Sequence, residues 1–293
     1  MPRIVQWIWI ALGIHLVLGF AAYLHYSATG SYHYLGLYFW MLGTLFFLLM
    51  TGVESCLAFE CRAGFDADEP MRLAWTFIAL ASLSRFTGTA LIAANDWHLT
   101  WITGQTSSSL ALISLQGLSQ AGAVVGGPLS MIFLTAGLSR VLKIQRKFGV
   151  LSRLTHIDQL LIGLIAVFTF CQVANIAHHI AQRPSLTMVF LWLSDPLLAL
   201  LLVEAVLIRR SVIRVGLGLI SQCWSMYVIA IVTTSAGDAS LWATSERLLS
   251  APLTALSWYI WFFAAAAFAS APAYQLAAMT LPQAQENAAR KRS

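Results

Sequence analysis

The sequence predicts an all-α fold, a polytopic bundle of about eight transmembrane helices with both termini in the cytoplasm. Three observations support this fold class. Hydrophobic residues make up 59% of the 293 positions and charged residues only 10%, whereas a soluble domain has about 25% charged residues. Apolar windows of membrane-spanning length recur along the chain. Basic residues concentrate in alternate loops between these windows, which is the pattern of a multi-pass membrane protein.

Each predicted span is an apolar window close to the length that crosses a bilayer. The windows cover roughly 4–24, 34–57, 73–94, 110–136, 158–178, 186–207, 216–234 and 248–269. No small-residue cleavage site follows the first window, so we interpret it as a first helix and not as a signal peptide. We expect one transmembrane domain over residues 1–281. The polar, basic segment 282–293 is expected to form a disordered cytoplasmic tail.

The basic residues predict the orientation of the chain. With the N-terminus inside, the cytoplasmic segments hold 14 of the 17 lysines and arginines: Arg3, Arg62, Arg72, Arg140, Lys143, Arg146, Lys147, Arg153, Arg209, Arg210, Arg214, Arg290, Lys291 and Arg292. This bias predicts an even number of spans. We interpret the net charge of +5 as a topology signal and a contact for anionic lipids, not as a nucleic-acid footprint. The expected location is a plasma or inner membrane.

Ionisable side chains at bilayer depth are costly unless they are paired or hydrated. Arg85 lies near the middle of the third window, and Asp195 lies at the middle of the sixth, directly before Pro196. Because both are at similar depth, we predict a contact between Arg85 and Asp195. The alternative to a functional site is an ion pair that only fixes how two helices pack.

Two glutamates lie closer to the cytoplasmic side. Glu54, on a face with Thr51, has few partners nearby in the sequence and is the better candidate for a proton or cation site. Glu204 follows Asp195 at a spacing that turns it to the opposite helix face. We expect Glu204 to reach the membrane interface near Arg209 or Arg210.

The fourth span is the most interrupted. Gln116 and Gln120 are candidate binding residues, and they precede the small-residue pair Gly122 and Gly126. Such a pair lets another helix approach closely, including a helix of a partner protein. The following Gly127-Pro128 is expected to kink or unwind the helix, as in many transporter sites. Tight packing around a harmless kink is the simpler alternative.

Amides and histidines form the remaining candidates. Gln172, Asn175 and His179 form a polar stripe on the fifth span. Haem with two axial histidines needs them on facing helices at equal depth, and only His25, His178 and His179 suggest such a site. His15 stands in a small-residue stripe with Ala11, Gly19 and Ala22 and is expected to be a neutral packing residue.

Several functions stay open at this point. A carrier for a small solute or ion fits the intramembrane charges. A sensory or accessory subunit that binds a ligand or partner helix fits the small-residue face, and a haem or quinone subunit is a further alternative. No motif of a membrane protease or hydrolase occurs, so an enzyme is not favoured. No span contains a lysine, which excludes a retinal Schiff base. The sequence identifies no cofactor.

Overall fold

The computed structural model describes residues 1–30, 33–98, 120–150, 155–182, 194–216, 218–245 and 254–290, and these contain helices and no strand. The elements in chain order are α1 (Arg3–Thr29), α2 (His33–Leu37), the π-helix η1 (Tyr38–Gly43), α3 (Thr44–Ala63), α4 (Pro70–His98), the π-helix η3 (Val125–Leu129), α6 (Ser130–Lys147), α7 (His156–Gln182), α9 (Ser194–Val215), α10 (Gly218–Ser245) and α11 (Thr254–Arg290). The predicted all-α class is confirmed.

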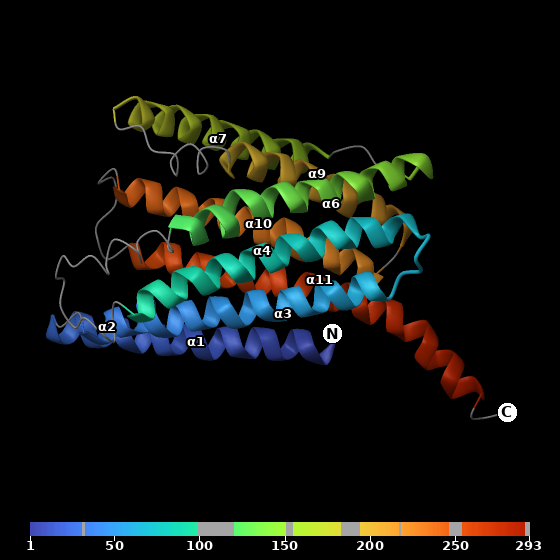
Figure 1. The fold of residues 1–293 in the computed structure, drawn as a ribbon, viewed down its shortest axis with the longest axis horizontal. Helices are drawn as coiled ribbons and strands as arrows, with labels where there is room; N and C mark the ends of the chain where they lie inside the picture. The colour runs from blue at the N-terminus through green and yellow to red at the C-terminus, as the bar shows by residue number, and fades with distance from the viewer. Residues whose placement is uncertain are drawn as a thin grey trace.

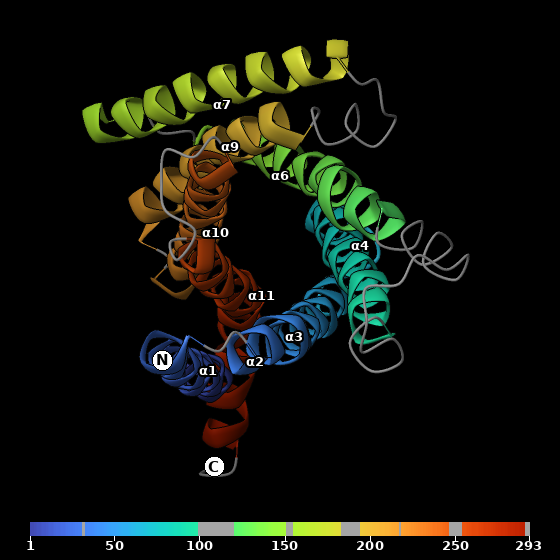
Figure 2. The same cartoon turned by 90° about the vertical axis from the view of Figure 1, so that its left-hand side faces the viewer.

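Six helices pack in a closed order (Figures 1 and 2). Around this ring α3 contacts α4, α4 contacts α6, α6 contacts α9, α9 contacts α10, α10 contacts α11, and α11 returns to α3. The largest cluster of buried apolar side chains takes residues from all six helices, among them Trp75, Leu134, Leu202 and Trp224. The centre of the bundle is therefore a shared core, and polar side chains within it are shielded from solvent.

Two helices lie outside the ring, on opposite edges of the bundle (Figure 2). Helix α1 packs against α11, and α7 packs against α9. Both expose large apolar side chains, including Trp7 at 68%, Val17 at 68% and Phe170 at 74% exposure. Exposed apolar stripes of this length are expected of helices that face lipid.

Six helical segments are long and apolar enough to cross a bilayer: Arg3–Thr29, Tyr34–Ala63, Pro70–Asn95, Gln120–Lys147, Gly218–Ser240 and Ser257–Thr280. Helices α7 and α9 occupy the places of the predicted fifth and sixth spans, but they are not among these six. The start of α1 and the end of α11 lie toward the same end of the bundle (Figure 1). The chain therefore has the fold and composition of a membrane protein, while eight spans and cytoplasmic termini stay predictions.

The C-terminal segment differs from the expectation. Helix α11 continues to Arg290, through most of the segment 282–293 that the sequence suggested to be a disordered tail. The reason is local, because the run Gln-Ala-Gln-Glu-Asn-Ala-Ala-Arg after Pro282 consists mostly of strong helix formers. Residues 291–293 lie outside the described part of the chain.

Candidate functional site

The central polar feature is an ion pair between Glu54 of α3 and Arg85 of α4. Nε of Arg85 donates to Oε2 of Glu54 at 3.2 Å, and Nη2 of Arg85 donates to Oε1 of the same carboxylate. Both carboxylate oxygens are thus bound by one guanidinium, the strongest geometry for this type of pair. The side chain of Glu54 is 1% exposed and that of Arg85 is 14% exposed.

Two aromatic residues surround this pair. Cζ of Arg85 lies 4.3 Å from the ring centroid of Phe268 on α11, a cation–π distance. Tyr227 of α10 packs near Phe268, with ring centroids 6.1 Å apart, and it is within electrostatic range of Glu54 and Arg85. The pair is therefore enclosed by four of the six ring helices, α3, α4, α10 and α11.

This arrangement changes the predicted pairing. The sequence suggested Asp195 as the contact of Arg85, and it suggested few partners for Glu54. In the structure, Arg85 binds Glu54. Helices α3 and α4 are consecutive and pack along each other, so their polar side chains meet before those of distant helices. The side chain of Asp195 lies outside the described residues, and its contact with Arg85 stays a prediction.

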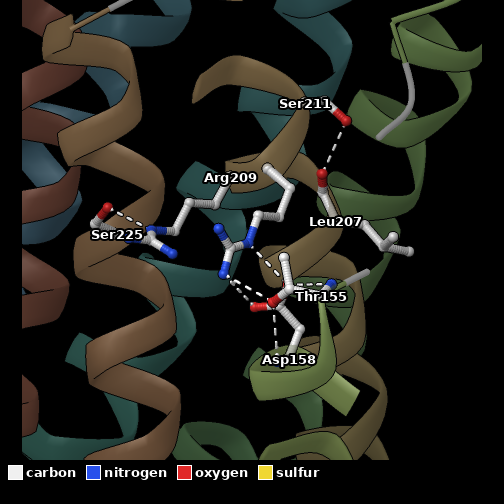
Figure 3. Close-up of polar contacts among 7 residues, drawn as sticks. Thr155, Asp158, Leu207, Arg209, Ser211 and Ser225 are labelled. Atoms are coloured by element: carbon white, nitrogen blue, oxygen red, sulfur yellow. Dashed lines mark hydrogen bonds and ion pairs between the residues drawn. The ribbon is translucent and has the colours of Figure 1, made fainter. Parts of the chain in front are cut away.

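Glu204 of α9 is a second buried carboxyl, 6% exposed. Its Oε1 accepts a hydrogen bond from the Ser139 hydroxyl of α6. Neither Arg209 nor Arg210 is a described partner of Glu204, and the expectation that Glu204 reaches the membrane interface near them stays a prediction. Nε of Arg209 donates to the Ser225 hydroxyl at 2.7 Å (Figure 3).

Arg210 instead joins the capping box at the start of α7. The side chain of Asp158 accepts from the backbone N–H of Thr155 at 2.8 Å, and the Thr155 hydroxyl accepts from the backbone N–H of Asp158 at 3.3 Å (Figure 3). This is the reciprocal geometry of a capping box, formed here by Thr155-His156-Ile157-Asp158. Arg210 donates to both carboxylate oxygens of Asp158, at 2.8 and 2.9 Å, and so attaches α7 to α9.

We expect Asp158→Ala to lower the free energy of unfolding by about 2 kcal/mol, the upper end for loss of a helix cap, because the change also removes the partner of Arg210. Thermal unfolding of the purified protein in detergent measures the loss. Asp68→Ala, in the exposed turn before α4, is the matched control and should change stability by less than about 0.5 kcal/mol. Equal stability of the two variants would contradict this role for Asp158.

The interruption at Gly127-Pro128 is a π-helical turn, not a break. Residues Val125–Leu129 form η3, with Pro128 inside it. The Ser130 hydroxyl donates to the carbonyls of Gly126 at 2.6 Å and Gly127 at 2.8 Å, which satisfies carbonyls in the widened turn. Such π turns recur at functional sites. A side chain built on Gly126 would lie 3.8 Å from the backbone oxygen of Arg85, so η3 lies beside the ion pair's helix.

The small-residue pair of the fourth span is used within the chain. A Cβ atom on Gly88 of α4 would lie 2.4 Å from Cα of Gly126 and 2.5 Å from the carbonyl oxygen of Gly122. The close helix approach predicted for Gly122 and Gly126 is confirmed, and α4 is the helix that makes it. Helix α4 therefore packs on this face within the described residues, and contact with a partner helix through Gly122 and Gly126 stays a prediction.

The amide candidates do not join the central pair in the described part of the chain. Gln120 is exposed, and Gln116 lies outside the described residues. Helix α7 carries the stripe of Gln172, Asn175 and His179, whose side chains also lie outside the description. Because α7 is on the outer edge of the bundle (Figure 2), its backbone is separated from the centre by α9.

The helices that carry the histidines suggested for haem do not face each other. His25 is on α1 and His178 is on α7, helices on opposite edges of the bundle (Figure 2), and both side chains are exposed. His15 is buried and stacks on Phe46 with centroids 4.4 Å apart. The small-residue stripe around it does allow close contact, because a Cβ on Gly19 would lie 2.4 Å from the Tyr38 ring. His15 thus packs within an aromatic cluster.

Sequence reasoning missed Phe268, Tyr227 and Ser139. Phe268 carries one signal, since it is the sole aromatic residue within the small-residue run 264–271, where other helices can approach α11 closely. Tyr227 and Ser139 carry no comparable signal, because single hydroxyl groups are common in apolar helices. No protein-family model matches the chain, and no curated protein or solved structure matches it significantly.

Proposed function

We propose that this chain is a membrane carrier for a small anionic solute, that it spans a plasma or inner membrane eight times with both termini in the cytoplasm, and that Arg85 is its binding residue. The observation that supports the proposal is a guanidinium held at the centre of the ring. An uncompensated charge in that environment costs several kcal/mol, and Glu54 compensates it here.

Arg85 retains capacity for a second anion. A guanidinium has five N–H donors, and the two hydrogen bonds to Glu54 use one on Nε and one on Nη2. The side chain of Arg85 is also the more exposed member of the pair. A carboxylate or phosphate group fits the geometry of the remaining donors. The π turn η3 beside α4 further supports a functional site here, because π turns recur at such sites.

Ligand-induced stabilisation tests this proposal. The purified protein is heated with acetate, succinate, phosphate or sulfate, and sodium chloride at equal ionic strength is the reference. We expect at least one of these anions to stabilise the protein, by about 2.7 kcal/mol at about 100 times its Kd. Uptake of that anion, radiolabelled, into liposomes containing the protein then distinguishes a carrier from a sensory subunit, which would bind without uptake.

Two variants locate the binding residue. Arg85→Lys keeps the positive charge but loses the planar fork of donors. The apparent affinity for the anion, measured from its stabilisation of the protein, should therefore fall about tenfold, which is equivalent to about 1.4 kcal/mol. Arg62→Lys is the matched control on α3, where the arginine side chain donates to Thr76. If both variants bind the anion as the wild type does, Arg85 is not the binding residue.

A further inference from the structure

Glu204 differs from the other buried carboxyl of the ring. Arg85 binds both oxygens of Glu54, whereas Glu204 has one hydrogen bond, from Ser139 to Oε1. Its Oε2 is buried and has no hydrogen-bond partner among the described residues. A carboxyl group that is more than nine-tenths buried and lacks a cation is strongly disfavoured in its ionised form.

Among the described residues, no cationic group on α9 or on the helices packed against it pairs with Glu204. Arg209 and Arg210, on α9 itself, bind Ser225 and Asp158. On α6, Cζ of Arg140 lies 5.3 Å from the ring centroid of Phe77 on α4. Other ionisable groups on α9 and on the elements packed against it are the exposed Lys143, Arg146, Lys147, His156, Cys171, His178 and Arg214, the Asp158 bound by Arg210, the buried Cys223 and Tyr227, and Asp238, which binds Trp261. The side chains of Asp195 and His179 lie outside the described residues.

A line of polar residues runs along α6 past this carboxyl. Thr135, Ser139 and Lys143 are spaced i, i+4, i+8, which places them along one helix face. The Thr135 hydroxyl is buried and has no partner among the described residues, Ser139 binds Glu204, and Lys143 is exposed near the end of the helix. Ser139 lies between Glu204 and the exposed end of this face at Lys143. Because Cβ atoms one turn apart are separated by about 5–6 Å, a proton moves along the face only with water between the side chains.

We propose that Glu204 is a reversible proton-binding site, reached along the Thr135–Ser139–Lys143 face of α6. The carboxylic acid is the form held in this conformation, and a proton leaves when the carboxyl gains water or a cation. The proton site itself is independent of the carrier proposal. Its role as the site of the coupling ion, a proton moved with the anion, rests on the proposed function.

Dicyclohexylcarbodiimide is a suitable probe, because it adds to protonated carboxyl groups in apolar surroundings and leaves a stable N-acylurea. The full-length protein in liposomes is treated over a range of pH, and the modified residue is located by mass spectrometry of its peptides. We expect labelling of Glu204 that falls as pH rises. Glu54 should stay unlabelled, because both of its carboxylate oxygens are bonded to Arg85, and Glu60, exposed on α3, is the accessible control.

Labelling of Glu204 no greater than that of Glu60 at every pH would overturn the proton site. Ser139→Ala gives a second measurement, because loss of the hydroxyl that stabilises the carboxylate should extend labelling of Glu204 to higher pH. Coupling is tested by Glu204→Gln, which should retain stabilisation by the anion but lose the pH dependence of uptake. Unchanged pH dependence would overturn the coupling role, whereas labelling of Glu204 without anion binding would overturn the carrier proposal alone.

Discussion

Glu54→Leu should lower the free energy of unfolding by about 3–5 kcal/mol, the usual cost of removing one partner from a buried ion pair. The carboxylate is 1% exposed and binds Arg85 through both oxygens. Without it, the guanidinium stays charged at every accessible pH and has no other anion among its described contacts. The loss should therefore be large, and it should be measurable by thermal unfolding and by titration with sodium dodecyl sulfate.

Companion variants separate charge from packing. Arg85→Met should cost less than Glu54→Leu, because an abandoned carboxyl can take up a proton whereas an abandoned guanidinium cannot lose one. The double variant Glu54→Leu/Arg85→Met removes both charges and should recover most of the stability, as replacement of whole buried pairs often does. Glu60→Leu, exposed on the same helix, is the control and should change stability by less than about 0.5 kcal/mol.

A loss below about 1 kcal/mol for Glu54→Leu would contradict a buried, mutually dependent pair. A double variant as unstable as Glu54→Leu would mean that the loss comes from packing around Leu and not from the charge. Recovery of stability in the double variant together with loss of anion binding would separate the two roles of Arg85. The protein would then be stable without Arg85, whereas binding of the anion would still require this residue.

The sequence predicted the helical class and long apolar segments, six of which are helices able to cross a bilayer in the described residues, because apolar period and length are local properties. It did not predict which polar residues meet. Their positions in the sequence predicted that Arg85 and Asp195 lie at similar depth in the membrane. The partner of a buried side chain depends also on which helices are neighbours and on how each helix is rotated about its axis. Glu54 faces Arg85 because α3 and α4 pack along each other, and neither fact can be read from spacing within one helix.

The same distinction applies to the other candidates. The pattern at Gly122 and Gly126 predicted a close helix contact, which α4 makes through Gly88; the pattern contained no information on the identity of that helix. Asp158 was predictable as a cap because its partners are adjacent in sequence. Ser139 and Glu204 are on helices that are distant in sequence, so their hydrogen bond depends on the closed order of the ring.

Gly88→Ala tests that ring at its tightest described backbone contact. A Cβ at this position would lie 2.4 Å from Cα and 2.4 Å from the backbone nitrogen of Gly126. Because backbone atoms cannot rotate away as a side chain can, α4 and the helix leading into η3 must separate. We expect a loss of about 3 kcal/mol, at the upper end for overpacking.

Gly163→Ala on α7 is the matched control, because nothing lies within 4 Å of a Cβ at that position. It replaces glycine within a helix without a clash and should stabilise the protein by about 0.5–1 kcal/mol. The two variants differ by one methyl group each, so thermal unfolding compares them directly. Similar melting temperatures for both would contradict the close contact between Gly88 and Gly126.

Gly88→Ala should also weaken anion binding at Arg85, one helical turn away, because α4 carries both residues and η3 packs against their backbone. The stabilisation by the anion identified for the wild type is the measure, with Gly163→Ala again as the control. If the anion binds Gly88→Ala with unchanged affinity while the protein loses stability, the contact supports the fold without positioning the guanidinium. A parallel loss of both would mean that the glycine contact holds α4 in the position from which Arg85 can bind.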